Sequence, residues 1–275
     1  MAPEETRNSG AQLDAVLRQV SGQLRQSLGN IASALERLAP PEARDADPDV
    51  DRSAAVLTQS YYRILRLTGN LSEAADLESP SQVQLSNDDI IGFCREMVRK
   101  AEEPARLLGL ELAFHSEKAT HIIAMNAERM ERLLMNLLSN AFKFTPRGGR
   151  VAVEVRIVRQ WVELRVSDTG CGIPRDRLET VYERYHFPQR ADPPPYGLGL
   201  GLPICRKIAW EHGGSLLIDS QEGVGTAVTL SLPNTRLRKQ SVHEPMGGFH
   251  DGFNHTLLEL ADALPREAFS AKYLD

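Results

Sequence analysis

The sequence has few of the residues that disulfide scaffolds, membrane spans and secretion signals require. Its three cysteines, Cys94, Cys171 and Cys205, are too widely spaced for a disulfide framework or a CxxC zinc site. No apolar run approaches the ~20 residues that cross a bilayer, and the polar segment 1–10 lacks the apolar core of a signal peptide. We therefore expect a cytoplasmic protein with no membrane span.

The chain also lacks an excess of basic residues. Its 32 Lys and Arg residues stand against 37 Asp and Glu residues, which gives a formal net charge of −5. Proteins that neutralise nucleic-acid phosphates present a strongly basic surface, so no nucleic-acid partner is expected. The hydrophobic share, 41% of 275 residues, predicts a globular protein of one large or two small domains.

Two long helices are predicted at the start of the chain. Apolar residues recur at steps of three and four over 11–38 and again over 51–77. A polar loop at 40–49 separates them, so the helices should form an antiparallel hairpin over 11–78. One hairpin cannot bury both sides of its apolar stripe, which favours a homodimeric four-helix bundle.

The rest of the chain predicts a linker, a mixed domain and a tail. The linker is expected at 79–89, the domain at 90–233, and the tail at 234–275, with a short amphipathic helix over 254–269. Helical patterns and alternating strand patterns both occur in the domain, which makes the fold class α+β. The helices are expected at 90–107, 126–144 and 203–212, and the strands at 111–115, 121–125, 150–159 and 161–167.

The predicted helix at 126–144 carries a polar stripe. Asn136, Asn140 and Lys143 lie at positions i, i+4 and i+7, so they share one helix face. Two carboxamides and an ammonium group can hold a metal ion and phosphate oxygens. A solvated helix face explains the same stripe equally well when it is considered alone.

Two glycine-rich segments follow this helix. In DTGCG (168–172), an Asp at a strand end can accept a hydrogen bond from an exocyclic amine, and the glycines allow close backbone approach to a flat ligand. The second segment, GLGLG (197–201), precedes a helix, and such a turn presents backbone N–H groups to phosphates. A GxGxG pattern alone is weak evidence.

Five segments in this order resemble the ATP-binding domain of sensor histidine kinases. This resemblance implies an N-terminal helical hairpin that forms a dimeric four-helix bundle, followed by a GHKL/Bergerat-type α/β sandwich that binds ATP. The hairpin resembles the dimerisation and phosphotransfer domain of the same family. The five segments are MNLLSNAFKFTP (135–146), SDTGCGIP (167–174), VYERYHFPQRAD (181–192), GLGLGLPICRKIAWEHGG (197–214) and SQEGVGTAVTLSLP (220–233).

The resemblance implies ATP and Mg²⁺ as cofactors and gives each motif position a role. Asp168 would accept a hydrogen bond from the adenine amine, Asn140 would hold Mg²⁺, and Lys143 would meet phosphate. Two F-box aromatics, Tyr182 and Tyr185, would anchor one end of a lid, although core packing explains them about as well. The other residues of the implied ATP site are Asn136, Gly170, Gly172, Gly197, Gly199, Gly201 and Thr226.

Residue 136 discriminates between branches of the implied superfamily. DNA gyrase, the mismatch-repair ATPases and the heat-shock chaperone have a Glu there, which is the general base that activates water. The amide of Asn136 cannot take up that proton. This residue therefore argues against efficient ATP hydrolysis and for the kinase branch.

The histidine that accepts phosphate in the family is missing. The family motif S-H-E-L-R-T-P-L-T-S-I aligns with SGQLRQSLGNI at 21–31. Gly22 replaces the histidine, Gln23 replaces the acid that acts as its base, and Ser27 replaces the proline. Since glycine has no side chain to phosphorylate, autophosphorylation at the usual position is not expected.

Three interpretations stay open. The chain could be a degenerate dimeric kinase that binds ATP and regulates a response-regulator receiver domain or a partner kinase. It could be an active kinase with another acceptor, such as Ser21, Ser27 or a histidine of a partner. It could also be a scaffold whose ATP site is structural. Intact ATP motifs beside a lost acceptor favour the first interpretation.

Gln26 supports one variant of that interpretation. It lies one helical turn after Gly22, where the family often has a hydroxyl or amide that orients water against a receiver's aspartyl phosphate. A glutamine side chain can both donate to and accept from that water. A solubilising surface glutamine is the simpler alternative.

Overall fold

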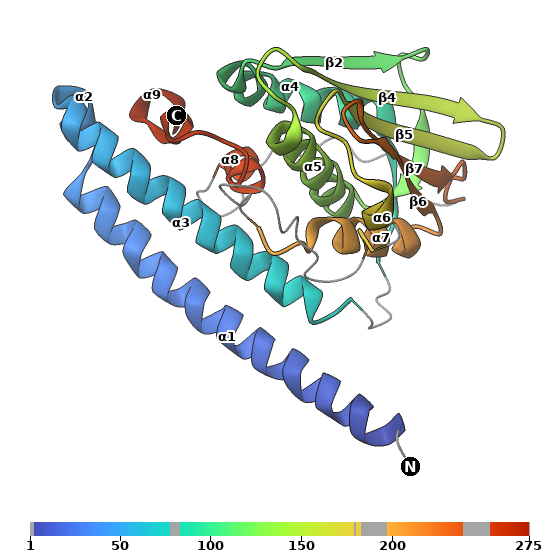
Figure 1. The fold of residues 1–275 in the computed structure, drawn as a ribbon, viewed down its shortest axis with the longest axis horizontal. Helices are drawn as coiled ribbons and strands as arrows, with labels where there is room; N and C mark the ends of the chain where they lie inside the picture. The colour runs from blue at the N-terminus through green and yellow to red at the C-terminus, as the bar shows by residue number, and fades with distance from the viewer. Residues whose placement is uncertain (1–2, 78–82, 179, 183–196, 239–253, 275) are drawn as a thin grey trace.

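Two long helices lie beside a domain in which helices cover one face of a five-stranded sheet (Figure 1). The structure is a computed structural model that describes residues 3–77, 83–178, 180–182, 197–238 and 254–274, with side chains from residue 15 onward. Within these ranges no helix has both the length and the apolar character needed to cross a membrane.

The first two long helices confirm the predicted antiparallel hairpin. They are α1 (Pro3–Leu38) and α3 (Pro48–Ala74), which pack side by side along their length (Figure 1). The prediction of a loop between them is wrong, because α2 (Pro41–Ala46) forms there with a proline at its first turn. The Asp47 side chain then caps α3 by accepting a hydrogen bond from the Asp49 N–H at 2.9 Å.

Part of the segment predicted as a linker is a strand. β1 (Ser86–Asp89) pairs antiparallel with β3 (Ile122–Met125). All four residues of β1 are polar, so no alternating pattern indicated the strand. Asn87 holds this sheet to the end of the domain, because its side chain donates to the Leu237 carbonyl at 3.0 Å and accepts from the Leu237 N–H at 2.8 Å.

The main sheet has the strand order β2-β4-β5-β7-β6. β2 pairs with β4 in parallel, and the other neighbours are antiparallel. Side chains alternate along β4, where Val151, Val153 and Val155 are buried and Arg156 is exposed, as in a sheet with one solvated face. The strands are β2 (Glu111–Ser116), β4 (Arg150–Val158), β5 (Trp161–Asp168), β6 (Ser215–Gln221) and β7 (Gly225–Pro233).

Three helices cover the apolar face of this sheet, and all three were predicted. They are α4 (Ile90–Leu108), α5 (Ala127–Phe144) and α7 (Gly201–Glu211); the short α6 (Arg175–Leu178) follows β5. The predicted cap of α5 is confirmed, because the Asn126 side chain accepts from the Arg129 N–H at 2.9 Å. Leu134 and Leu138 of α5 are fully buried in the core.

The end of the chain folds back onto the molecule as several short elements. These are α8 (His255–Leu260), the 3₁₀ helix η1 (Arg266–Phe269) and α9 (Ala271–Leu274). Pro265 cannot continue a helix, which explains why the predicted single helix over 254–269 is wrong. We call residues 254–274 the docked tail; its α8 packs against both α3 and α5 (Figure 1).

Candidate functional site

A cavity of about 240 Å³ lies between α5, the end of β5 and the start of α7. Its wall combines the polar stripe of α5, the strand-end aspartate and the glycine-rich turn. The sequence-predicted residues that line it are Asn136, Asn140, Lys143, Asp168, Gly172, Gly197, Gly199, Gly201 and Thr226.

Three predicted site residues remain, namely Gly170, Tyr182 and Tyr185. Gly170 lies behind the cavity wall, where a Cβ atom would be 2.5 Å from the Phe144 carbonyl oxygen. Tyr182 packs on the domain, because its hydroxyl donates to the Leu216 carbonyl at 3.0 Å and the Arg206 guanidinium lies over its ring. Tyr185 lies outside the described residues.

Asn136 and Asn140 form the amide stripe of α5, which faces the start of α7. A Cβ atom added at Gly201 would lie 3.5 Å from Asn136 Oδ1 and 3.8 Å from Asn140 Nδ2. Asn136 is 1% exposed, and its Nδ2 atom is buried without a hydrogen-bond partner. A buried amide donor of this kind is unfavourable unless an acceptor reaches it, which suits a site built to receive oxygen atoms.

Asp168 is oriented by the backbone on both sides of it. Its Oδ1 atom accepts from the Gly170 N–H at 2.8 Å and from the Thr226 N–H at 3.3 Å. Thr226 is also its register partner across β5 and β7. Burial raises the pKa of the carboxyl, and the two backbone hydrogen bonds act in the opposite direction.

One glycine of DTGCG is also required by the packing of the chain. The expectation that these glycines admit a flat ligand stays a prediction. At Gly172, with φ of 67°, a Cβ atom would lie 2.1 Å from the Gln221 carbonyl oxygen. The closest approach there is made by the turn between β6 and β7, so Gly172 is needed for chain packing.

Lys143 carries a perturbed charge at the cavity wall. Burial lowers its pKa to about 8, while the carboxylate of Asp262 acts in the opposite direction. Lys143 Nζ lies 3.9 Å from Asp262 Oδ2. The ammonium group therefore changes its protonation state near pH 8, well below the usual range of lysine.

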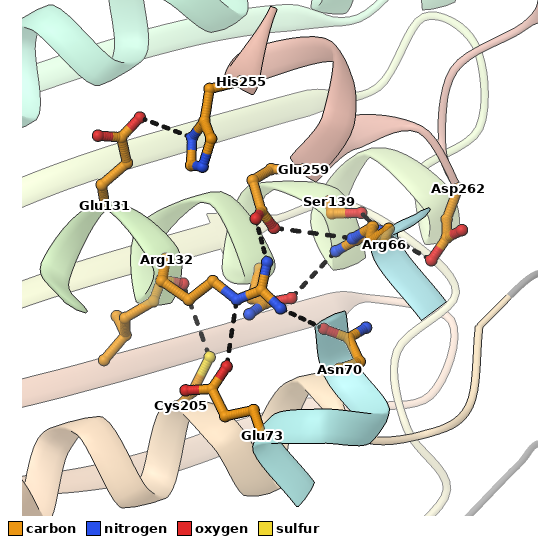
Figure 2. A network of polar contacts seen from close by, with 12 residues as sticks. Arg66, Asn70, Glu73, Glu131, Arg132, Ser139, Cys205, His255, Glu259 and Asp262 are labelled. Carbon is orange, nitrogen blue, oxygen red and sulfur yellow. Dashed lines mark hydrogen bonds and ion pairs between the residues drawn. The ribbon is translucent and has the colours of Figure 1, made fainter. Parts of the chain in front are cut away.

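Sequence reasoning missed three charged residues that also line the cavity. Arg66 comes from α3, Arg177 from α6 and Asp262 from the docked tail. Arg66 Nη1 donates to Asp262 Oδ2 at 2.8 Å and to Ser139 Oγ at 2.9 Å. Figure 2 shows the Arg66 side chain between Ser139 and Asp262, with Glu259 nearby.

A second arginine completes this buried network (Figure 2). The Arg132 guanidinium of α5 contacts Glu259 of the docked tail, and also Asn70 of α3 at 2.6 Å and Glu73 at 3.3 Å. The network thus joins α3, α5 and the docked tail. One signal could have revealed it, namely a polar stripe on α3 at steps of four and three: Gln59, Arg63, Arg66, Asn70 and Glu73.

The segment predicted to correspond to the family's phosphoacceptor region lies on an exposed part of α1. Gly22 and Gln26 are both exposed, and a Cβ atom at Gly22 would meet nothing within 4 Å. Ser21 is 1% exposed, which argues against it as an alternative phosphate acceptor. The Ser27 hydroxyl donates to the Gln23 carbonyl at 3.1 Å.

An amide-bearing helix, a strand-end aspartate and a glycine-rich helix start around one cavity define a GHKL-type nucleotide-binding domain. Residues 125–236 match the family model for the histidine kinase-, DNA gyrase B-, and HSP90-like ATPase. These residues thus form a histidine kinase-like ATPase domain, and the chain as a whole is similar to sensor histidine kinases of two-component signalling.

Curated relatives extend the match beyond the nucleotide-binding domain. The chain is 29% identical over 224 residues to the adaptive-response sensory kinase SasA of Synechococcus sp. (strain CC9902), which covers 80% of this chain and 56% of SasA. It is 30% identical over 229 residues to the hybrid signal transduction histidine kinase D of Dictyostelium discoideum, covering 78% of this chain and 14% of that protein. The chain thus spans about half the length of SasA.

Solved structures agree on the fold. The catalytic domain of histidine kinase ThkA is 25% identical with a TM-score of 0.50, covering 56% of this chain and 99% of ThkA's domain. Full-length ShkA in complex with AMPPNP is 24% identical with a TM-score of 0.64, covering 80% of this chain and 45% of ShkA. The second likeness extends the shared fold to the helical hairpin.

Proposed function

We propose that this chain is a dimeric, ATP·Mg²⁺-binding regulator that does not phosphorylate itself at Gly22. Its target would be a response-regulator receiver domain or a partner kinase. One observation carries the proposal: nine of the predicted nucleotide-site residues line one cavity, whereas the exposed acceptor position of α1 has no side chain.

The cavity chemistry fits ATP with Mg²⁺. The Asp168 carboxylate would accept from the adenine amine, and Lys143 and the N–H groups of the turn at 197–201 would meet the phosphates. Among the described residues no cluster of three or more His, Cys, Asp or Glu side chains could hold a metal. Mg²⁺ commonly uses few protein ligands together with phosphates and water, so Asn140 would be its side-chain ligand.

The surface of the hairpin favours a homodimer. Several large apolar side chains of α1 and α3 are exposed in the single chain, and a second copy would cover them. They are Val16, Val20, Leu24 and Ile31 of α1, and Leu57 and Ile64 of α3.

A receiver domain is the partner that best fits the exposed acceptor face. The chain shares its fold, with 19% identity and a TM-score of 0.55, with histidine kinase ThkA in complex with the response regulator protein TrrA. On such a face, the exposed Gln26 amide could orient water against an aspartyl phosphate. Gln26→Ala should then slow the loss of phosphate from a phosphorylated receiver; an unchanged receiver lifetime would exclude this role.

Calorimetry with ATP and Mg²⁺ tests the central proposal. We expect binding by the unmodified chain and a loss of affinity in Asp168→Asn, which keeps the acceptor Oδ1 atom but removes the negative charge. Asp219→Asn on the exposed side of β6 is the matched control and should bind normally. Absence of binding at millimolar ATP would overturn the proposal.

A further inference from the structure

A carboxylate of the docked tail occupies the phosphate side of the cavity. Asp262 Oδ2 lies 2.8 Å from Arg66 Nη1 and 3.9 Å from Lys143 Nζ. A Cβ atom added at Gly197 would lie 3.4 Å from both Asp262 Oδ2 and Lys143 Nζ. The carboxylate therefore sits between two cations at the beginning of the glycine-rich turn.

Arg66 has the chemistry and the position of an anion ligand. Its Nη2 atom donates to Asn136 Oδ1 at 3.0 Å, and its side chain is 4% exposed. The hydrogen bonds to Ser139 and Asn136 hold the guanidinium against the amide stripe of α5. A planar guanidinium suits phosphate oxygens as well as carboxylate oxygens.

The buried network is incompletely satisfied in this arrangement. Asp262 Oδ1, Asn136 Nδ2 and Arg66 Nε have no hydrogen-bond partner. Arg66 Nε faces Glu259 Oε2 at 3.8 Å. The donor left for an entering phosphate oxygen is therefore Asn136 Nδ2, on a residue that lines the cavity. Exchange of the carboxylate for phosphate would therefore relieve this unpaired donor as well as replace an ion pair.

We propose that Arg66 of α3 is a phosphate-binding residue of the nucleotide site. In the free protein the Asp262 carboxylate pairs with the Arg66 guanidinium, and the ATP phosphates displace this carboxylate when they bind. This inference rests on the proposed function, because it requires nucleotide in the cavity. A carboxylate and a phosphate cannot share this guanidinium without like-charge repulsion. The Asp262 carboxylate thus competes with the ATP phosphates for the Arg66 guanidinium.

The docked tail links the exchange of carboxylate for phosphate to the helical hairpin. Its backbone is bound to α3 by Arg63, which donates to the Ala261 carbonyl at 3.1 Å, and by Gln59, which donates to the Leu264 carbonyl at 2.8 Å. Releasing Asp262 from Arg66 would remove a buried ion pair between the tail and α3. ATP would therefore loosen the tail, while adenosine, which has no phosphate, would not.

The decisive experiment compares ATP·Mg²⁺ with adenosine by calorimetry on the full chain. Asp262→Asn should bind ATP about tenfold more tightly, the effect of removing one close like charge, with unchanged affinity for adenosine. Glu267→Gln, an exposed carboxylate of the same tail, is the matched control and should match the unmodified chain. The double variant Arg66→Gln/Asp262→Asn should lose the gain in ATP affinity.

The outcomes separate this inference from the proposed function. If neither ATP nor adenosine binds any variant, the nucleotide-binding proposal fails. If both ligands bind but Asp262→Asn leaves ATP affinity unchanged or weaker, only the Asp262 inference fails.

Hydrogen exchange on the unmodified chain provides a readout that needs no variant. ATP·Mg²⁺ should speed amide exchange in residues 257–264 relative to adenosine. Equal exchange with the two ligands, both at saturation, would overturn the displacement of the tail even if Asp262→Asn fails to fold.

Discussion

Arg66 Nη2 donates a hydrogen bond to Asn136 Oδ1 at 3.0 Å, which links the helical hairpin directly to the amide stripe of α5. Both side chains are almost fully buried, at 4% and 1% exposed. A buried charged network between two domains holds them in one arrangement only while its partners are in place. A change in the nucleotide cavity that moves Asn136 would therefore alter the contacts of Arg66 and thus of α3.

Restoring the family residues at the acceptor position should test whether the phosphotransfer machinery is otherwise intact. Gly22 has open space around its Cα, so the histidine of Gly22→His fits without a clash, and Gln23→Glu supplies its base. We expect acid-labile phosphate on this double variant after incubation with γ-labelled ATP.

A matched control exists on the same helix. Gly29→His places an imidazole at another exposed glycine of α1 with open space around it, and it should remain unlabelled. Acid-labile phosphate on the unmodified chain would contradict the proposal that Gly22 ends self-phosphorylation.

Charges placed on the apolar face of the hairpin should separate the proposed dimer. Leu57 and Ile64 are 55% and 42% exposed in the single chain. Leu57→Glu with Ile64→Glu should bury unpaired carboxylates in a four-helix bundle, which is strongly unfavourable. Light scattering at micromolar concentration should change from dimer to monomer, whereas Leu217→Glu on β6 should stay dimeric. A monomeric unmodified chain would rule the bundle out.

The affinity for ATP should depend on pH through Lys143. Burial lowers its pKa to about 8 in the free protein, and phosphate binding requires the protonated ammonium. Binding above pH 8 must therefore take up a proton, so affinity should fall by about tenfold per pH unit between pH 8 and pH 10. Below pH 7 the ammonium is already present, and its contribution to affinity should be constant.

Lys143→Arg separates this effect from general alkaline changes. A guanidinium stays charged throughout that range, so the variant should bind ATP with an affinity that varies little between pH 7 and pH 10. A steep fall in Lys143→Arg, or none in the unmodified chain, would refute the role of this ammonium.

Docking of the tail should contribute measurably to stability. Phe269 is fully buried, and its ring centroid lies 5.6 Å from that of Tyr62 on α3. Phe269→Ala should lower the free energy of unfolding by about 3–5 kcal/mol in urea denaturation. Val224→Ala, at a 60% exposed side chain, should change it by less than about 0.5 kcal/mol. A small effect at Phe269 would mean that the tail is not docked in solution.

Local patterns in the sequence were sufficient for the long helices, for the strands β2, β4 and β5 of the main sheet, and for much of the cavity wall. The cap at Asn126, the stripe of Asn136, Asn140 and Lys143, and the alternation along β4 each depend on neighbours within a few residues. Helical and strand periods are visible at that range. The absence of a phosphate-accepting side chain at Gly22 likewise follows from the sequence alone, because folding cannot change the type of a residue.

Tertiary structure alone decided which polar stripes are buried and what lies across the cavity. Arg66 and Asp262 are 196 positions apart, and no local period connects them. The stripe of α3 that includes Arg66 matches a solvated helix face until the docked tail and α5 cover it. Likewise, Gly172 is explained by the Gln221 carbonyl oxygen, which only the pairing of distant strands brings near. Burial is a property of the assembled chain, because it depends on surfaces that meet only after long loops have closed.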